Sequence, residues 1–299
     1  MRVLDKAGLI RYEHEGDGTR PEIERGDLRA ILLASFPSHL IHCGATVTDI
    51  ISVGGGRHEV TVTSGYSFTT DLLIGADGAW SRVRPVTSDA KPAYFGISFV
   101  ETHLKKADQE YPEAGRLVGQ GSMFALSDEK GLIAHRETSG DIRVYIALKA
   151  DELWVSSGEI DFEDSTSAKA ALLGHFAGWN DALRALIADG DEFVPRRIHA
   201  LPVGHRWDRI AGVTLIGDAA HLMSHFAGKG ANQAMLDGAE LGQAIVANPA
   251  DIEAAPASYE KAMFPRSAAH AGASASNLTV AFEPDAPRGF LDLMMSYQQ

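Results

Sequence analysis

The chain has 299 residues, of which 45% are hydrophobic and 22% charged, and its formal net charge is −13. An acidic surface repels a phosphate backbone, so nucleic acid is a poor candidate partner. No apolar run reaches the roughly 18 residues that a membrane span needs, and the first residues lack the apolar stretch of a secretory signal. Cys43 is the only cysteine, which excludes an internal disulfide and favours a cytoplasmic location. Its apolar surroundings predict a small core residue.

The N-terminal part of the sequence predicts one helix followed by short strands. Residues 21–36 fit a helix because Leu28, Ile31 and Leu32 recur at helical spacing. Residues 45–64 are typical of strands around a triple-glycine turn. A further strand over 68–74 leads into a glycine-rich segment.

From residue 85 to 199 the pattern changes to that of an antiparallel sheet. Four stretches are separated by clusters of Gly, Asp and Ser, which is typical of strands and turns. These stretches are 94–103, 115–126, 131–137 and 141–148. One or two helices are predicted over 165–188, and residues 195–203 are predicted to be extended.

The C-terminal third predicts a buried strand followed by two helices. The strand covers 212–217, the first helix 232–246, and a long alanine-rich helix 251–278. The fold class that we predict is therefore α/β, with a mixed sheet, an antiparallel sheet and C-terminal helices.

Two segments share one design, in which an apolar strand ends in a glycine–aspartate turn and a helix follows. They are DLLIGADGAWSRVR at 71–84 and VTLIGDAAHLMSHFAGKGANQAML at 213–236. Such a helix directs its unpaired N–H groups and positive dipole end toward the carboxyl end of the strand, where ligands bind in α/β sheets. Asp77 and Asp218 could accept hydrogen bonds from ligand hydroxyls while the N–H groups take a phosphate. The alternative is that both aspartates only cap helices.

These two segments resemble the downstream flavin motifs of the FAD-dependent aromatic hydroxylases, the para-hydroxybenzoate hydroxylase-like group. Within that group the chain looks most like the tetracycline-modifying monooxygenases. The segment RPEIERGDLRAILL at 20–33 resembles the arginine-bearing helix of the same family.

The resemblance implies a cofactor site. Asp218 would bind the ribityl chain of FAD, and a helix beginning near Gly228 would point at the isoalloxazine ring. Asp77 and Gly78 would belong to a motif that the family uses for both flavin and nicotinamide. The residues implied in cofactor binding are Arg25, Asp77, Gly78, Gly217, Asp218, Gly228, Gly230, Ala231 and Asn232.

The resemblance also implies an activity. The chain would be an FAD-dependent monooxygenase that uses NAD(P)H as reductant and dioxygen as oxygen donor, acting on a polycyclic or phenolic small molecule such as a tetracycline. Residues 1–84 and 200–248 would form the FAD-binding domain, 85–199 the substrate domain, and 249–299 C-terminal helices. His135 lies on a predicted strand and could face the substrate, or it could lie at a solvated strand end. The resemblance assigns no catalytic residue.

One family element is missing from the sequence, the strand–GxGxxG–helix unit that holds the FAD pyrophosphate. Gly119-Gln120-Gly121 and Gly228-Lys229-Gly230 supply only GxG. We therefore expect an FAD-binding domain without its first βαβ unit. Three accounts stand open: a fragment of a longer monooxygenase, a partner chain that supplies the unit, or a non-catalytic remnant that does not bind FAD productively.

His221 and His225 are spaced like zinc ligands on a helix. The intervening residues lack the glutamate of HExxH, and the glycines that follow indicate a bend. We therefore expect no metal site, and His221 is expected to be structural or near the flavin.

Overall fold

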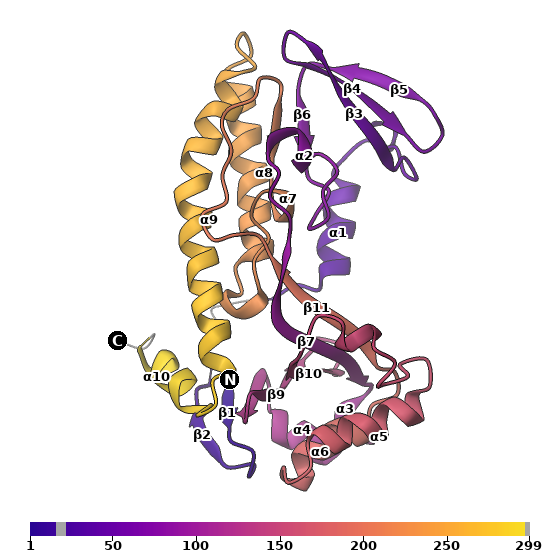
Figure 1. Ribbon diagram of the computed structural model, residues 1–299, viewed down its shortest axis with the longest axis vertical. Coiled ribbons are helices and arrows are strands. Elements are labelled where there is room, and N and C mark those ends of the chain that lie inside the picture. Colours follow the sequence, from indigo (N-terminus) through magenta and orange to yellow (C-terminus); the bar gives the residue numbers. More distant parts are fainter. Residues whose placement is uncertain (16–21, 297–299) are drawn as a thin grey trace. The chain divides into compact units, whose positions relative to one another are not determined.

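The computed structural model describes residues 1–15 and 22–296. The chain folds into two compact units. The first comprises Met1–Pro37, Gly96–Ile198 and Thr279–Gln299, and the second comprises Ser38–Phe95 and His199–Leu278. Each unit therefore draws on segments that are far apart in the sequence (Figure 1).

The first unit is built on a seven-stranded sheet with the order β11-β7-β10-β9-β8-β1-β2. Its strands are β1 (Arg2–Leu4), β2 (Ile10–Glu13), β7 (Ala93–Leu104), β8 (Ser122–Ser127), β9 (Lys130–Arg136), β10 (Ile142–Lys149) and β11 (Val194–Ala200). Strands β7 to β10 pair antiparallel, as predicted. Strand β1 adds to β8 in parallel, so the N-terminal residues extend this sheet.

Helices cover one face of this sheet. They are α3 (Ala107–Glu110), α4 (Pro112–Val118), α5 (Ser165–His175) and α6 (Asp181–Ala188). Because side chains alternate along a strand, Ile142, Val144 and Ile146 of β10 enter the same core as Leu172 and Leu183 of the helices. The intervening residues of β10 project from the opposite face, which is where the polar side chains of the sheet gather.

The predicted strand over 115–126 is wrong in its first half. Residues Pro112–Val118 form α4, and only Ser122–Ser127 form a strand. Proline suits the first turn of a helix because its missing N–H would be unpaired there. Ala114 and Val118 then fall on one helical face and are buried in the core. Gly119, at φ 76°, ends the helix.

The second unit has two small sheets. Strands β6 (Leu73–Gly75) and β12 (Val213–Leu215) pair in parallel. Strands β3 (Val47–Gly54), β4 (Arg57–Val62) and β5 (Ser67–Thr70) form an antiparallel sheet around the predicted triple-glycine turn. The single strand predicted over 68–74 is thus two strands that belong to different sheets.

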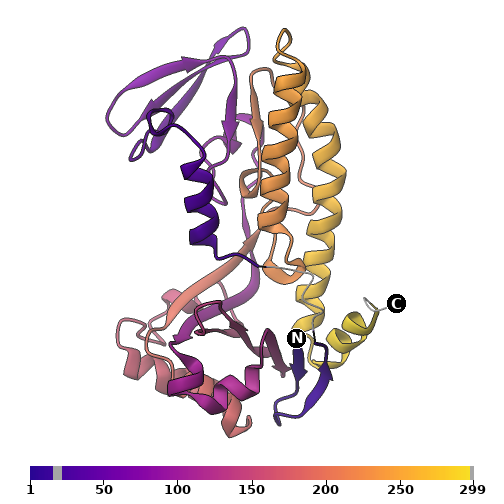
Figure 2. The same cartoon turned by 180° about the vertical axis from the view of Figure 1, so that it is seen from behind.

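Helices of the second unit pack on β12. They are α2 (Arg84–Thr87), α7 (Asp218–His221), α8 (Gly230–Ala247) and α9 (Ala254–Ala281). The last three residues of α9 belong to the first unit. Helices α8 and α9 lie side by side in both views (Figures 1 and 2). Leu215 of the strand meets Leu241 of α8 and Met263 of α9 in one apolar cluster. This packing fixes the carboxyl end of β12, where the second glycine turn begins.

The remaining elements lie outside these cores. Helix α1 (Arg25–Ala34) falls within the helix predicted over 21–36, whose Pro21 lies outside the described residues. None of its residues is buried. The last described helix is α10 (Arg288–Ser296), and short 3-10 turns occur at η1 (Ser38–Leu40), η2 (Trp154–Ser156) and η3 (His225–Ala227).

Cys43 is exposed, so its predicted core position is wrong. The predicted α/β class is confirmed, and no helix in the described residues is long and apolar enough to cross a membrane.

Candidate cofactor-binding site

The first glycine turn follows β6 and is fixed by its own side chains. Gly78 has φ 81°, a conformation that glycine adopts without strain. An Asp77 Oδ2 atom accepts the N–H groups of Arg82 at 2.7 Å and Val83 at 3.3 Å. Ser81 Oγ accepts the N–H of Arg84 at 2.9 Å. Asp77 therefore holds the two N–H groups just before α2, whose N-cap residue is Val83, and its contact with a cofactor stays a prediction.

The second glycine turn follows β12 and leaves its aspartate open. Gly217 has φ 60° and ψ −141°. A Cβ atom at this position would lie 3.0 Å from the Cβ atom of Ala234, so both backbone conformation and space require glycine. Asp218 begins α7 and is exposed. Its carboxylate has no side-chain hydrogen bond or ion pair in the part of the chain that the structure describes. It is thus available to a ligand.

Arg84 joins the two turns. Its side chain is buried, with the residue only 3% exposed. Nε donates to the carbonyl of Ala219 at 2.7 Å, and Nη2 donates to those of Ala79 at 2.8 Å and Asp218 at 3.1 Å. Burial lowers the pKa of Arg84, although the nearby carboxylates Asp77 and Asp218 partly offset this. One guanidinium therefore holds both glycine turns at the carboxyl ends of the parallel strands.

Sequence reasoning missed Arg84, although it is the last residue of the quoted GADGAWSRVR segment. The available signal was an arginine between Val83 and Val86, in a stretch that is otherwise apolar. Such a cation is seldom buried unless acceptors surround it. The acceptors themselves could not be foreseen, because Ala219 is 135 residues away.

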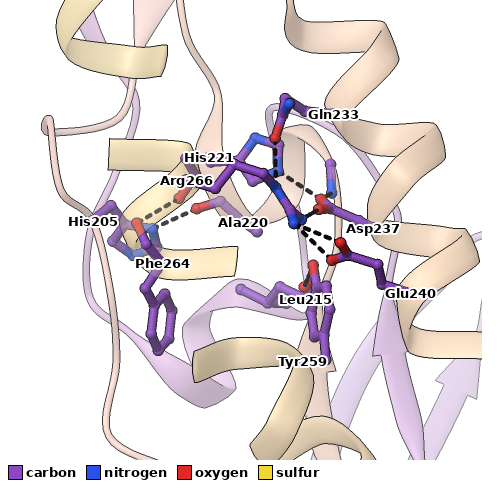
Figure 3. A network of polar contacts seen from close by, with 12 residues as sticks. His205, Leu215, Ala220, His221, Gln233, Asp237, Glu240, Tyr259, Phe264 and Arg266 are labelled. Carbon is purple, nitrogen blue, oxygen red and sulfur yellow. Dashed lines mark hydrogen bonds and ion pairs between the residues drawn. The ribbon is translucent and has the colours of Figure 1, made fainter. Parts of the chain in front are cut away.

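A buried polar network lies behind the second turn (Figure 3). Asp237 of α8 is fully buried. Its Oδ2 accepts the N–H of Gly217 at 2.9 Å and a hydrogen bond from His221 Nε2 at 2.6 Å. Its Oδ1 accepts from Arg266 of α9 at 2.8 Å. Arg266 also binds Glu240 at 2.7 Å. The network ties α7, α8 and α9 to the backbone of the turn.

The charge of Asp237 is stabilised by these donors. Burial by itself raises the pKa of Asp237. The hydrogen bonds from His221, the Gly217 N–H and Arg266 outweigh burial, so that the pKa lies below its usual range. Asp237 thus keeps its negative charge at neutral pH and holds the turn as a charged acceptor.

The two histidines of the HLMSH segment do not share a helix. His221 is the last residue of α7, and His225 begins η3 after the helix ends at Leu222. The His221 ring is directed at Asp237 (Figure 3). Among residues 1–15 and 22–296, no group of three or more His, Cys, Asp or Glu side chains could hold a metal ion.

The predicted helix start after the second turn is present. Helix α8 begins at Gly230 with Lys229 as its N-cap residue, and Gly228 precedes it at φ 60°. Ala231 and Asn232 are exposed in its first turn. The first N–H groups of a helix have no acceptor within it and carry the positive end of its dipole. They are available to a partly negative ligand atom.

The predicted site residues fall in both units. The two glycine turns and the start of α8 lie in the second unit, whereas Arg25, the first residue of α1, and His135 of β9 belong to the first. His135 binds Ser122 through Nδ1 at 3.0 Å and Glu22 through Nε2 at 3.2 Å. The structure therefore brings together the predicted residues of the glycine turns and the α8 start within one unit.

Known proteins are similar in sequence to this chain. Residues 57–257 match the model of the FAD binding domain family. Monooxygenase penA of Penicillium thymicola is 33% identical over 287 residues, which cover 82% of this chain and 66% of that protein. Monooxygenase asqM of Emericella nidulans is 30% identical over an alignment of 358 residues, gaps included. The alignment covers 99% of this chain and 81% of that protein.

Solved structures show the same fold. Klebsiella pneumoniae HpxO, complexed with FAD and uric acid, aligns with a TM-score of 0.74 at 22% identity, covering 92% of this chain and 66% of that one. The tetracycline destructase Tet(51) aligns with a TM-score of 0.67 at 18% identity, covering 99% and 76%. The chain spans about two thirds of the length of the Penicillium and Klebsiella proteins. The matches confirm the resemblance seen in the motifs: the chain belongs to the FAD-binding family of flavin-dependent monooxygenases.

Proposed function

We propose that this chain binds FAD and acts as an NAD(P)H-dependent monooxygenase that transfers one oxygen atom of dioxygen to a small aromatic substrate. The observation that carries the proposal is the free, exposed carboxylate of Asp218. It stands on a glycine turn that Arg84 and Asp237 hold in place.

The residues of the second unit suit a flavin. Gly217 lets the turn lie close to α8, because a Cβ atom there would crowd Ala234, and Asp218 offers acceptor oxygens to ribityl hydroxyls. The N–H groups at the start of α8, over Gly230–Asn232, offer donors to the pyrimidine end of the ring. Asp77, Gly78, Gly228 and Arg25 complete the set that we propose.

The bound flavin would supply electron transfer from NAD(P)H and the activation of dioxygen, which amino acid side chains cannot perform. The protein would supply position and charge. The dipole of α8 stabilises negative charge at its N-terminal end, typically by about 0.3–1 kcal/mol. Asp237 holds the Gly217 N–H and so keeps Asp218 in a constant orientation.

The first unit suits an aromatic substrate. Its sheet carries the aromatic pair Phe99–Tyr145, with ring centroids 5.5 Å apart, and Phe124 of the sheet lies 5.2 Å from Phe290 of α10. Such rings stack favourably on a further aromatic ring. We therefore propose that the segment 85–199 is the substrate domain, that His135 contacts the substrate, and that the substrate is polycyclic or phenolic. A tetracycline is one candidate, and the cytoplasm is the proposed location.

Flavin titration tests the proposal. The purified chain should quench FAD fluorescence and shift its visible spectrum on binding. With a substrate panel that includes phenols and a tetracycline, NADH or NADPH oxidation should depend on substrate, and labelled dioxygen should place one oxygen atom in the product. A chain that binds no FAD would overturn the proposal and support a non-catalytic remnant.

A further inference from the structure

Four polar side chains form one row across the sheet of the first unit. The strand register pairs Ser122 with His135, His135 with Arg143, and Arg143 with His103. Their neighbours along the strands, including Met123, Ala134 and Val144, enter the core beneath the helices. Because side chains alternate, the polar row lies on the face of the sheet opposite that core.

The His135 ring is held from one side and presents a donor on the other. Ser122 Oγ lies 3.0 Å from Nδ1, and a Glu22 carboxylate oxygen lies 3.2 Å from Nε2. An ionised carboxylate only accepts hydrogen bonds, so Nε2 carries the proton in this pair. With neutral imidazole, Ser122 donates its O–H to Nδ1. The orientation of the ring thus depends on Ser122, while Nε2–H faces the acidic partner.

A cavity of about 220 Å³ adjoins this donor. It is lined by residues 22–24, 135–138, Arg143 and Tyr145. Pockets that enclose a whole small ligand measure roughly 300–1,000 Å³. The cavity therefore suits a single ring or the head group of a larger molecule. Tyr145, which packs against Phe99, supplies an aromatic wall.

One donor beside the cavity has no acceptor among the described residues. Arg143 binds Glu137 and Glu101 through its terminal nitrogens, yet its buried Nε–H has no hydrogen-bond partner among the described residues. A buried donor without an acceptor is costly. An additional acceptor oxygen would therefore be favourable here.

Glu22 is an exchangeable occupant of the position at Nε2. Its side chain is 72% exposed, and its ion pair with His135 is the only contact recorded for its carboxylate within residues 1–15 and 22–296. Exposed ion pairs contribute little to stability because water competes for both charges. An incoming anion takes the position of the Glu22 carboxylate at His135 Nε2, so one negative charge replaces another there. The ion pair between Glu137 and Arg143 is not disturbed.

We propose that this cavity binds an ionised phenolic oxygen of the substrate through His135 Nε2–H, and that Glu22 occupies the same position until the substrate displaces it. This inference rests on the proposed function, since it names the group by which the proposed substrate is held. Ser122 is then a positioning residue for the imidazole.

Para-nitrophenol tests the proposal directly, because its visible absorbance distinguishes the ionised from the neutral form. At mildly alkaline pH the protein should bind para-nitrophenolate with a spectral shift, and para-nitroanisole, which lacks the ionisable hydroxyl, should bind at least several-fold more weakly. Glu22→Gln should tighten para-nitrophenolate binding several-fold, since it removes a competing anion. His135→Gln should weaken it about tenfold, as expected for the loss of a charge-assisted hydrogen bond.

Glu159→Gln is the matched control. Glu159 also pairs with a histidine of the first unit, His175, at 3.6 Å, but it is not among the residues that line the cavity. This variant should bind para-nitrophenolate as the unaltered protein does. Ser122→Ala serves as a second probe if His135→Gln fails to fold, and it should weaken para-nitrophenolate binding relative to the unaltered protein because the imidazole loses the partner that orients it.

The proposal is overturned if Glu22→Gln leaves binding unchanged or weakens it, or if para-nitroanisole binds as tightly as para-nitrophenolate. FAD titration of the same preparations separates this outcome from failure of the proposed function. A chain that binds no FAD yet shows the expected nitrophenolate pattern retains the subsite and loses only the flavin role.

Discussion

The two units each contain a histidine–carboxylate pair, and the pairs differ in burial. His221 and Asp237 lie 2.6 Å apart with side chains 3% and 0% exposed. His135 and Glu22 lie 3.2 Å apart with side chains 35% and 72% exposed. The same chemistry therefore occurs in the interior in the first of these pairs and at the surface in the second, and the difference indicates which of the two is structural and which can exchange partners.

The number of donors explains why the buried pair is fixed. Asp237 accepts from the Gly217 N–H and His221, at the two ends of α7, and from Arg266 of α9. A buried charge is tolerated only when such partners surround it. Within residues 1–15 and 22–296, Glu22 pairs only with His135, and water can take its place. We infer that Asp237 maintains the cofactor turn and that Glu22 yields to a ligand.

The largest effect expected is from Asp237→Ala. Removal of one partner from a buried ion pair costs about 3–5 kcal/mol because the other charge stays buried and unpaired. The free energy of unfolding, measured by urea denaturation, should fall by this amount. Glu22→Ala is the matched change at the exposed pair and should alter stability by less than about 0.5 kcal/mol. Equal losses in the two variants would contradict the distinction between the pairs.

Arg84→Gln should have the next largest effect. The shorter amide cannot reach the carbonyls of Ala79, Asp218 and Ala219 together, so buried acceptors lose a charged donor. We expect a stability loss of roughly 2–3 kcal/mol and weaker FAD binding, because both turns are released. Thermal melting and flavin titration measure the two effects.

Arg82→Gln controls for the loss of one positive charge. Arg82 lies two residues away, is exposed, and makes no side-chain hydrogen bond or ion pair in the described part of the chain. The Arg82→Gln variant should have the same melting temperature as the unaltered protein. If Arg84→Gln melts at that same temperature, the joining role of Arg84 is wrong.

Asp218→Ala should affect the cofactor and spare the fold. The carboxylate makes no side-chain hydrogen bond or ion pair within the described residues, so its removal leaves no partner unsatisfied in the protein. Loss of hydrogen bonds to the ribityl chain should cost about 1–3 kcal/mol of FAD affinity. Asp208→Ala removes another exposed carboxylate of the second unit and should leave FAD affinity unchanged. Unaltered FAD affinity in Asp218→Ala would end this assignment.

The smallest effect expected is on the pH dependence of stability. The pKa of Asp237 is lowered in the folded chain, so its contribution is fully present above the unfolded pKa and is lost as pH falls through the folded pKa. Asp237→Asn should therefore flatten the acid limb of a plot of unfolding free energy against pH.

The pKa of Glu260 is shifted in the opposite direction from that of Asp237, so Glu260 provides the comparison. Burial raises the pKa of Glu260 despite its hydrogen bonds from Thr214 and Trp207. Its protonation as pH falls therefore favours the folded state. Glu260→Gln should make the acid limb steeper. Identical slopes in both variants would show that neither carboxylate governs acid unfolding.

Local patterns predicted the parts of the structure that local physics controls. The triple-glycine hairpin, strands β7, β9 and β10, and helices α5, α8 and α9 were all expected from periodicity or turn residues. The glycine turns were also readable, because Gly78 and Gly217 adopt positive φ, a conformation that glycine adopts without strain. Helix α4 was misread since its apolar residues fit either period.

The sequence by itself thus determined the family and the two glycine turns. Only the tertiary structure decided which side chains hold these features. Arg84 meets carbonyls 135 residues away, Asp237 meets a turn 20 residues earlier, and His135 meets Glu22 from before α1. No periodicity encodes such pairs, because each depends on how separate elements pack and not on the conformation of any one of them.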